Sequence, residues 1–496
     1  MNPSKKCEIL ILGAGPAGLT AGWELSRNGK KVIVLESDPK FVGGIARTAS
    51  FNEFRFDIGG HRFFTKSTEV QKIWTEILDE ENWLRDVPRL SRIYFNRKFF
   101  AYPLKPIDAV FKLGLFKSVS AILSYLKYKV FPIKNVVSFE DWVINNFGKK
   151  LFLVFFKTYT EKVWGIPCSE ISADWAAQRI KGLSLSKAII SAVLSGLTPK
   201  AKSRNIKTLI DKFDYPKLGP GMVWEEAAKK INNSSQSEVI LSSRVTCLRL
   251  ENRNIISCEV NNNSYDYFET KQVISTLPIR DLINIISPKP PKDVIENANN
   301  LKYRDFLTVV LILNTKDIFP DNWIYIHEPN VKLGRIQNFK NWSPKMVPDS
   351  NMTSLGLEYF CNEGDELWTL SDKDLIELGI KELFEIDLIK PQWFVDGTVL
   401  RMPKAYPVYD ASYKAQLRII RSWLDENIQN LQLVGRNGMH MYNNQDHSML
   451  AAHLAARNLL GESWDPWKVN ADAEYHEEVL VQPSGRMVPR RISDQP

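Results

Sequence analysis

The two ends of the chain share one pattern, in which an apolar run stops at a glycine and a helix-like stretch follows. Near the start, CEILILGAGPAGLTAGWEL predicts a buried parallel strand, a glycine turn and a helix, and KKVIVLE predicts a second strand ending at Glu36. Near the end, LQLVG predicts an apolar strand that stops at Gly435, and NQDHSMLAAHLAARNLL predicts a helix. We therefore expect the end of the chain to return and complete the sheet that its beginning starts.

Between these ends the pattern changes three times. Residues from about 106 to 197 have helical periodicity with few turn signals, and KFDYPKLGPGMVWEEAAKKI predicts a turn that leads into a helix. SEVILSSRVTCLRLENRNIISCEV and YFETKQVISTLP predict strands with hairpin-type breaks. FLTVVLILN, WIYIHEP and TSLGLEYF predict an antiparallel sheet, which we expect to form the floor of a substrate cavity.

The composition indicates a globular protein of several domains but does not identify its binding partner. A chain of 496 residues with 44% hydrophobic residues can build two or three domains. A net charge of +8 suits phosphates, nucleic acid or an anionic membrane equally. Its five cysteines form no CxxC pair, which argues against a zinc site or a disulfide framework. Since neither a signal peptide nor a run of about 18 apolar residues is present, we expect a cytoplasmic protein without a transmembrane segment.

The first glycine turn has the spacing of a dinucleotide-binding motif. Gly13, Gly15 and Gly18 form the pattern G-x-G-x-x-G, which permits a tight turn, the approach of a pyrophosphate and close helix packing. Glu36 follows at the position where a carboxylate can bind a ribose hydroxyl, and VGGIART adds two glycines and an arginine suited to phosphate. This continuation resembles FAD-binding flavoproteins of the glutathione-reductase and amine-oxidase type, which implies FAD as the cofactor.

The fold class expected from these patterns is α/β, with a discontinuous Rossmann-type FAD-binding domain, a helical domain and an antiparallel-sheet substrate domain. The FAD-binding parts are expected at residues 1–65, 210–290 and 426–470. The substrate-sheet parts are expected at 66–105 and 291–425, the helical domain at 106–200, and a flexible tail at 471–496.

Five further phrases resemble the UDP-galactopyranose mutases, particularly the longer eukaryotic kind. They are GGHRFF after FDIGG, KVWGIPCSEISADWAAQRI, WIYIHEPN followed by GRIQNFKNWSP, AYPVYD, and YNNQDHSML. The last phrase matches the eukaryotic mutases almost letter for letter, and the resemblance spans nearly the whole chain. AYPLKP departs from the family, because Lys105 stands where the mutases have a glutamine that contacts the uracil. The sequence therefore does not identify the base of the nucleotide-sugar substrate.

The resemblance implies roles for named residues. Those implied in catalysis are the flavin-loop His61, the diphosphate-binding Arg179 and Arg335 with Tyr406 near them, Trp323 and Tyr325 beside the sugar, and Tyr442 and Asn444 over the flavin. Those implied in FAD binding are Gly13, Gly15, Pro16, Ala17, Gly18, Glu36, Ser37, Gly43, Gly44, Arg47, Gly60, His61, Val245, Gly435, Arg436, Asp446, His447 and Ser448. Paired arginines suit this chemistry because a leaving diphosphate gains negative charge.

The activity implied by the resemblance is a flavin-dependent nucleotide-sugar mutase. Such an enzyme converts a pyranose to a furanose through an adduct between reduced flavin N5 and the sugar, without net redox change, and we expect its product to serve cell-surface polysaccharide synthesis. By analogy, NAD(P)H would serve as reductant, and no nucleic-acid partner is expected. The alternative enzyme is an FAD oxidase or desaturase of the protoporphyrinogen oxidase or amine oxidase type. A non-catalytic flavin-binding scaffold is the third hypothesis.

Residues 99–135 combine six lysines and one acid with many aromatic residues. They predict either a basic amphipathic helix that makes peripheral contact with a membrane, or helices that cover the cavity with a solvated lysine face. We favour the second interpretation, because such helices pack on protein as readily as on lipid. The nearby histidines His440, His447 and His453 match no metal-ligand spacing, so no metal site is expected.

Overall fold

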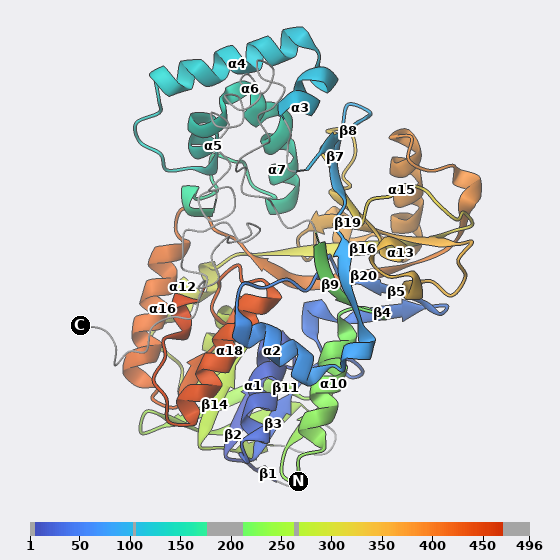
Figure 1. Cartoon of the computed structure of the whole chain (residues 1–496). Coiled ribbons are helices and arrows are strands. Elements are labelled where there is room, and N and C mark those ends of the chain that lie inside the picture. Colours follow the sequence, from blue (N-terminus) through green and yellow to red (C-terminus); the bar gives the residue numbers. More distant parts are fainter. Residues whose placement is uncertain (1–4, 103–105, 176–211, 262–266, 470–496) are drawn as a thin grey trace.

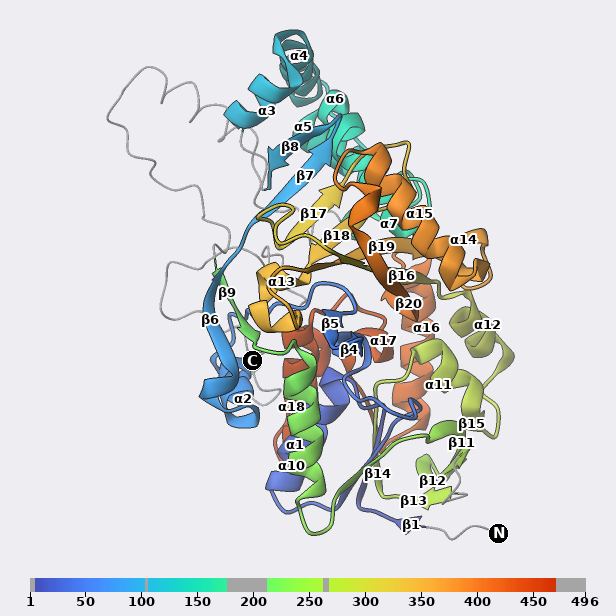
Figure 2. The same cartoon turned by 90° about the vertical axis from the view of Figure 1, so that its right-hand side faces the viewer.

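The structure is a computed structural model that describes residues 5–102, 106–175, 212–261 and 267–469. Arg179, Lys105 and the expected tail at 471–496 lie outside these residues. Figures 1 and 2 show three layers along the long axis. A helical unit occupies one end, a nucleotide-binding-type sheet with its helices occupies the other, and a large sheet lies between them.

A five-stranded, all-parallel sheet brings the two ends of the chain together. Its strand order is β10 (Glu238–Ile240), β3 (Val32–Leu35), β2 (Ile9–Leu12), β14 (Gln272–Ser275) and β21 (Leu431–Leu433). The strands come from three distant parts of the sequence, so the predicted discontinuous Rossmann-type sheet is confirmed. Each central strand is buried on both faces, which explains its unbroken apolar sequence.

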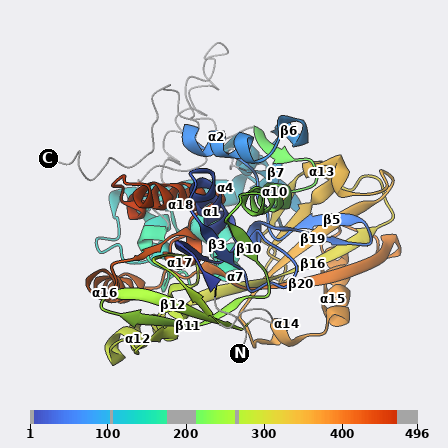
Figure 3. The ribbon, with the colours of Figure 1, turned by 90° about the horizontal axis from the view of Figure 1, so that it is seen from below.

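Alternate residues of β2 and β3 face two different cores. Ile9 and Ile11 pack beneath the helices α1 (Pro16–Arg27), α10 (Gly221–Asn232) and α18 (Gln445–Leu459). Leu10 and Leu12 face the core on the other side, against a second sheet. That sheet has the order β1 (Lys5–Lys6), β13 (Tyr267–Glu269), β12 (Asn254–Asn261), β11 (Arg244–Glu251) and β15 (Ile286–Ser287). Figure 3 shows the helices and this second sheet on opposite sides of the parallel strands.

The third sheet has seven strands and lies above the glycine turns. Its order is β20 (Phe394–Pro407), β16 (Tyr303–Leu313), β19 (Thr353–Cys361), β18 (Arg335–Asn338), β17 (Trp323–Ile326), β7 (Ser91–Phe95) and β8 (Lys98–Ala101). The sequence predicts an antiparallel sheet, but β17 and β7 pair in parallel. The sheet is therefore mixed, because a hairpin from an early part of the chain docks on the open edge of β17.

The remaining elements connect these layers. The helical unit contains α3 (Pro106–Leu113), α4 (Leu115–Val130), α5 (Phe139–Phe147), α6 (Lys149–Leu151), the π-helical turn η3 (Phe152–Lys157) and α7 (Thr158–Trp164). The other strands are β4 (Thr48–Phe51), β5 (Phe54–Asp57), β6 (Trp83–Pro88) and β9 (Lys212–Pro216). The other helices are α2 (Thr68–Ile77), α11 (Ile279–Ile285), α12 (Lys292–Asn300), α13 (Phe339–Trp342), α14 (Glu366–Thr369), α15 (Asp372–Glu385), α16 (Tyr413–Asn427) and α17 (Gly435–Gly438). The 3₁₀ turns are η1 (Gly44–Ala46), η2 (Glu80–Asn82), η4 (Pro344–Met346), η5 (Pro391–Trp393) and η6 (Pro466–Lys468).

The outward side of α4 carries both lysines and apolar side chains. Lys117, Lys127 and Lys129 are exposed, as the sequence predicts, but Phe116 is 92% exposed and Leu123 is 62% exposed, so the surface is more apolar than a solvated lysine face alone. Across the described residues, no helix is both long and apolar enough to span a bilayer.

Candidate functional site

The first glycine turn is closed by backbone contacts that leave no room for side chains. Gly13 has a φ of +96°, and a Cβ on Gly18 would stand 1.9 Å from the Gly13 carbonyl oxygen. A Cβ on Gly15 would instead meet nothing within 4 Å, so open space lies beside this residue. Gly15 caps α1 without a side chain, and Pro16 occupies the start of the helix. The helix N-terminus can therefore bind an anion such as a pyrophosphate.

Glu36 closes the turn from the end of β3. Its carboxylate accepts hydrogen bonds from the Ala14 N–H at 2.8 Å and the Asp38 N–H at 2.9 Å, and the Ser37 hydroxyl lies 3.2 Å from the same group. Because each carboxylate oxygen can accept more than one hydrogen bond, Glu36 can still accept one from a ribose hydroxyl. The predicted acid is thus part of the turn itself.

The second pair of glycines lies directly against the first turn. Gly43 and Gly44 have φ values of +96° and +53°, and a Cβ on Gly44 would stand 3.4 Å from the Gly15 Cα. Arg47 follows, with an Nη1 2.6 Å from an Asp38 carboxylate oxygen. This ion pair holds the guanidinium beside the turn, where the sequence predicts a phosphate contact.

Val245 lies at the same edge of the parallel sheet. The preceding Ser243 N–H donates a hydrogen bond to the Glu36 carbonyl at 2.7 Å, which brings the start of β11 beside the end of β3. The Val245 side chain is half-buried and packs on the core between the two five-stranded sheets.

The second glycine phrase contacts the first. Gly435 begins α17 with a φ of +82°, and a Cβ there would stand 3.1 Å from the Cβ of Ala17 in α1. A Cβ on Gly438 would stand 2.9 Å from the carbonyl oxygen of Ser275 in β14. Small residues at both ends of the sequence therefore let α1, α17 and the parallel sheet approach closely, as α1 and α18 also do.

The predicted NQDHS phrase forms the N-terminus of α18. Asn444 caps this helix through a reciprocal pair of hydrogen bonds with His447, whose Nδ1 lies 3.4 Å from the Asn444 N–H. Asp446, His447 and Ser448 are all buried in the first turn. Asn444 thus has a capping role in addition to the role implied by the resemblance.

His61 lies near two guanidinium groups, on a loop that follows Gly59 and Gly60. A Cβ on the preceding Gly59, which has a φ of +83°, would stand 3.6 Å from His61 Cε1 and 3.9 Å from Arg335 Nη2. Burial, aided by the positive charges of Arg436 and Arg335, lowers the pKa of His61 to about 3. The imidazole is therefore neutral at physiological pH, and its buried Nδ1 has no hydrogen-bond partner among the described residues.

Arg335 is held in place by a carboxylate that the sequence analysis did not identify. Its Nε and Nη2 lie 2.8 and 2.5 Å from one oxygen of Glu358, directly opposite in the antiparallel pair β18 and β19. Gln337 Nε2 donates to the other oxygen at 2.9 Å, and a Cβ on Gly60 would stand 3.1 Å from that same nitrogen. Burial alone would lower the pKa of Arg335, but Glu358 raises it well above its ordinary value.

A row of aromatic rings continues from Arg335 toward the helical unit. Tyr325 lies 4.9 Å from Tyr102 and 5.5 Å from Tyr159, measured between ring centroids. Tyr159, from α7, stacks on His327 at 4.8 Å with nearly parallel planes. Burial raises the pKa of Tyr159 well above its ordinary value despite the nearby Arg335 charge, so its phenol remains a hydrogen-bond donor.

Trp323 lies on the same strand but is almost completely buried. It stacks on Trp342 at 5.3 Å, and the guanidinium carbons of Arg62 and Arg89 lie 5.7 and 5.4 Å from its ring. This packing gives Trp323 a structural role and limits the part of its ring that a sugar could contact.

Tyr406 and Tyr442 form a stacked pair beside Arg436. Their ring centroids are 5.5 Å apart with planes inclined by 13°, and the Arg436 guanidinium lies 5.3 and 5.0 Å from the two rings. Arg436 also donates to the carbonyls of Asn443 at 2.9 Å and Ala405 at 3.1 Å. These rings and carbonyls are neutral groups, which leaves the positive charge of Arg436 available to an anion.

The structure thus brings together most of the predicted site residues and adds others. His61, Arg335, Tyr325, Tyr406, Tyr442 and Arg436 form one continuous cluster next to the glycine turns. Tyr159, His327, Gln337 and Glu358 were missed. His327 and Gln337 lie inside the phrases WIYIHEPN and GRIQNFKNWSP, but nothing in those phrases singles them out, and Tyr159 and Glu358 lie in stretches that resemble an ordinary helix and an ordinary strand. Only the register of β18 and β19 reveals that Glu358 faces Arg335.

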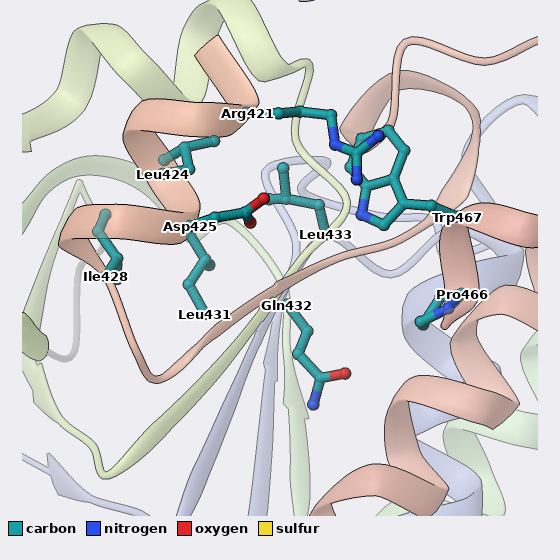
Figure 4. Close-up of a pocket in the computed structure, with 9 residues that line it drawn as sticks. All are labelled: Arg421, Leu424, Asp425, Ile428, Leu431, Gln432, Leu433, Pro466 and Trp467. Carbon is teal, nitrogen blue, oxygen red and sulfur yellow. The ribbon is translucent and has the colours of Figure 1, made fainter. Parts of the chain in front are cut away.

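A separate cavity of about 150 Å³ lies along the outer edge of the parallel sheet. Figure 4 shows that it is bordered by α16, β21 and η6, with the Arg421 guanidinium turned toward Trp467. None of the predicted site residues that the structure describes lines it. Among the described residues, no three His, Cys, Asp or Glu side chains are grouped to hold a metal ion.

Comparisons with known proteins agree on the fold. A family profile described as flavin containing amine oxidoreductase matches residues 16–460. Among solved structures, reduced UDP-galactopyranose mutase superposes with a TM-score of 0.80 at 20% identity, covering 94% of this chain and 98% of that one. A protein assigned as protoporphyrinogen oxidase from Exiguobacterium sp. 255-15 superposes with a TM-score of 0.68 at 14% identity, covering 92% and 99%. Putrescine oxidase bound to putrescine gives 0.58 at 16% identity, covering 92% and 100%.

Two curated relatives share short stretches of sequence with this chain. An inactive all-trans-retinol 13,14-reductase of Danio rerio is 46% identical over 52 residues, which are 10% of this chain and 8% of the reductase. An L-glutamate oxidase precursor of Streptomyces viridosporus is 45% identical over 53 residues, which are 11% of this chain and 7% of the precursor. The chain therefore spans less than a tenth of the length of these two relatives.

Proposed function

The chain belongs to the family of flavin-containing amine oxidoreductases and is an FAD-dependent flavoprotein, and from this premise we propose that it is a nucleotide-sugar mutase. The proposed reaction interconverts the pyranose and furanose forms of the sugar without net oxidation. Its product would serve the synthesis of cell-surface polysaccharide, and NAD(P)H would keep the flavin reduced.

The glycine turns fit the cofactor. The open space beside Gly15, the uncapped N-terminus of α1 and the acidic side chain of Glu36 correspond to a pyrophosphate and a ribose. When bound in its reduced form, FAD would supply the nucleophile for the isomerisation. The protein residues must then bind the leaving diphosphate, orient the sugar and exclude water.

The position of Arg335 is the observation that carries this proposal. Its guanidinium is fixed by Glu358 and lies close to His61 and to the phenols of Tyr159 and Tyr406. A fixed guanidinium stabilises the negative charge that develops on a leaving diphosphate, and protonated phenols can donate to the same oxygens without adding charge. Neutral His61 can accept a hydrogen bond beside them.

An amine substrate suits this cluster less well. Arg335 and Arg436 contribute two positive charges around neutral His61, whereas Glu358 contributes one negative charge. A protonated amine would be repelled by the excess positive charge. The family relationship nevertheless supports an FAD oxidase or desaturase equally, and that activity is the second candidate because some of its substrates are anionic or uncharged.

The proposal is tested by nucleotide affinity in a matched pair of variants. Arg335→Lys keeps the charge but loses the two-point contact with Glu358. Arg92→Lys makes the same change at the partly buried pair of Arg92 and Asp321. We expect the affinity of the reduced holoenzyme for UDP, GDP or dTDP to fall about 10-fold in Arg335→Lys. Arg92→Lys should leave it unchanged.

Titration of intrinsic fluorescence with each nucleoside diphosphate measures this difference. Equal affinities for the wild type and both variants would contradict a diphosphate role for Arg335. Oxygen uptake with an amine or apolar substrate, in the absence of any isomerised sugar, would instead favour the oxidase.

A further inference from the structure

The outer face of α4 carries a continuous row of exposed apolar side chains. The row consists of Phe116 (92% exposed), Val119 (47%), Leu123 (62%), Leu126 (51%) and Val130 (68%). Their spacing of three and four residues places them on one stripe along the whole helix. A stripe of this kind normally faces a protein core or another apolar surface.

Packing of the opposite face fixes the stripe on the outside. Ser118, Ala121 and Tyr125 are buried where α4 packs on α5 and α6. A Cβ on Gly148 would stand only 2.7 Å from the Tyr125 backbone nitrogen, so the two backbones approach closely. Rotation of α4 about its axis would break this contact, and the apolar stripe therefore stays exposed.

Apolar exposure continues beyond both ends of the helix. Phe111 on α3 is 81% exposed, and Phe131 after α4 is 72% exposed. Figures 1 and 2 show α4 lying across the end of the molecule that is farthest from the parallel sheet. A flat surface could therefore approach the stripe without obstruction from the parallel sheet or its helices.

Positive charges border the stripe, and negative charges are missing from this part of the sequence. Lys127 and Lys129 on α4 are exposed and lie three or four residues from the stripe residues Leu126 and Leu123, and their ammonium groups lie 5.7 and 5.6 Å from the rings of Tyr128 and Tyr125. The sequence contains no Asp or Glu between Asp108 and Glu140. The surface thus combines apolar side chains with exposed lysines, in a segment of the sequence that has no acidic residue.

We propose that this face of α4 docks on the surface of an anionic lipid membrane. The phenylalanine and leucine side chains would enter the boundary between headgroups and acyl chains, and the lysines would contact lipid phosphates. Charge distinguishes this partner from a second copy of the chain, because pairing two α4 stripes would place like-charged lysines side by side. The helix lies on the membrane and does not cross it.

The experiment measures sedimentation of the FAD-loaded full-length protein with vesicles. Vesicles of phosphatidylcholine with about 30% phosphatidylglycerol are compared with pure phosphatidylcholine at about 50 and 500 mM NaCl. Binding is expected only to the anionic vesicles, and it should weaken at the higher salt concentration.

Two pairs of variants separate the stripe from general effects. Leu123→Gln with Leu126→Gln removes apolar contacts at exposed positions while keeping good helix formers, and should weaken binding at least 10-fold. Phe384→Gln with Ile419→Gln alters exposed apolar residues on other helices and should leave binding unchanged.

The second pair of variants tests the contribution of charge. Lys127→Gln with Lys129→Gln should weaken binding about 30-fold. Lys292→Gln with Lys373→Gln makes the same change in net charge on other helices and should have little effect.

Several results would overturn the proposal. Equal binding to neutral and anionic vesicles would exclude recognition of anionic lipid. Absence of vesicle binding would also exclude it, and light scattering would then show whether a second copy covers the stripe. A dimer that Leu123→Gln and Leu126→Gln convert to a monomer would identify a second copy as the partner.

Discussion

The glycine turns and the arginine–tyrosine cluster are neighbouring regions built on different principles. At the turns, backbone atoms make the contacts, and the essential property of Gly18 is that it has no Cβ. In the cluster, side chains from three parts of the fold make the contacts, as in the pair of Arg335 and Glu358. A site made of backbone is therefore visible as a local sequence motif, whereas a site made of side chains depends on the register of distant strands.

The largest effect should come from breaking the side-chain site at Glu358. Glu358→Ala leaves Arg335 without its buried partner, and we expect the free energy of unfolding to fall by about 3–5 kcal/mol. Glu366→Ala is the control, because it removes an 82% exposed carboxylate that pairs with Lys332, and it should cost less than about 1 kcal/mol. Urea denaturation measures both values. Similar losses in the two variants would contradict the structural role of Glu358.

The backbone site should respond in two different ways to the same small change. Gly18→Ala places a Cβ 1.9 Å from the Gly13 oxygen and should lower the free energy of unfolding by about 1–3 kcal/mol even without FAD. Gly15→Ala places a Cβ in open space and should leave the apoprotein stable, while FAD binding is weakened. Thermal melting of the apoproteins and the FAD content of the purified variants measure the two effects. A destabilised Gly15→Ala apoprotein would show that this space is needed for the fold.

A smaller, pH-dependent effect tests burial within the side-chain site. Burial lowers the pKa of His327 to about 3, so between pH 6.5 and pH 3 the unfolded chain binds a proton at His327 that the folded chain does not. His327 therefore reduces stability as the pH falls through this window. His327→Phe should gain about 1.4 kcal/mol relative to the wild type for each pH unit between pH 6 and pH 4. A constant difference across this range, measured by urea denaturation, would show that His327 titrates normally.

The sequence predicts the backbone site better than the side-chain site for a physical reason. Gly13, Gly15, Gly18 and Glu36 are local in sequence, and their spacing alone specifies strand, turn and helix. The return of Gly435 to α1 could also be predicted, because an apolar strand and a helix repeat the same pattern. Both glycine turns can thus be predicted, because each depends on residues that are close together in the sequence.

Other features depend on packing that no short segment specifies. Glu358 lies within a stretch that resembles any buried strand, and its partner is known only from the pairing of β18 with β19. The parallel pairing of β17 with β7 joins segments more than 200 residues apart in sequence. Which face of α4 is exposed likewise depends on where α5 and α6 lie. The role implied for Arg179 stays a prediction, because this residue lies outside the described structure.

The mutase activity is tested most directly by an anaerobic incubation of the dithionite-reduced holoenzyme with UDP-, GDP- and dTDP-hexoses. Anion-exchange chromatography then separates any new isomer of equal mass. We expect one new peak, dependent on reduced flavin and strongly reduced in Arg335→Ala, whose identity gives the base and the sugar. No isomer with any nucleotide sugar, together with oxygen uptake by the oxidised protein on an amine or apolar compound, would contradict the mutase and establish an oxidase.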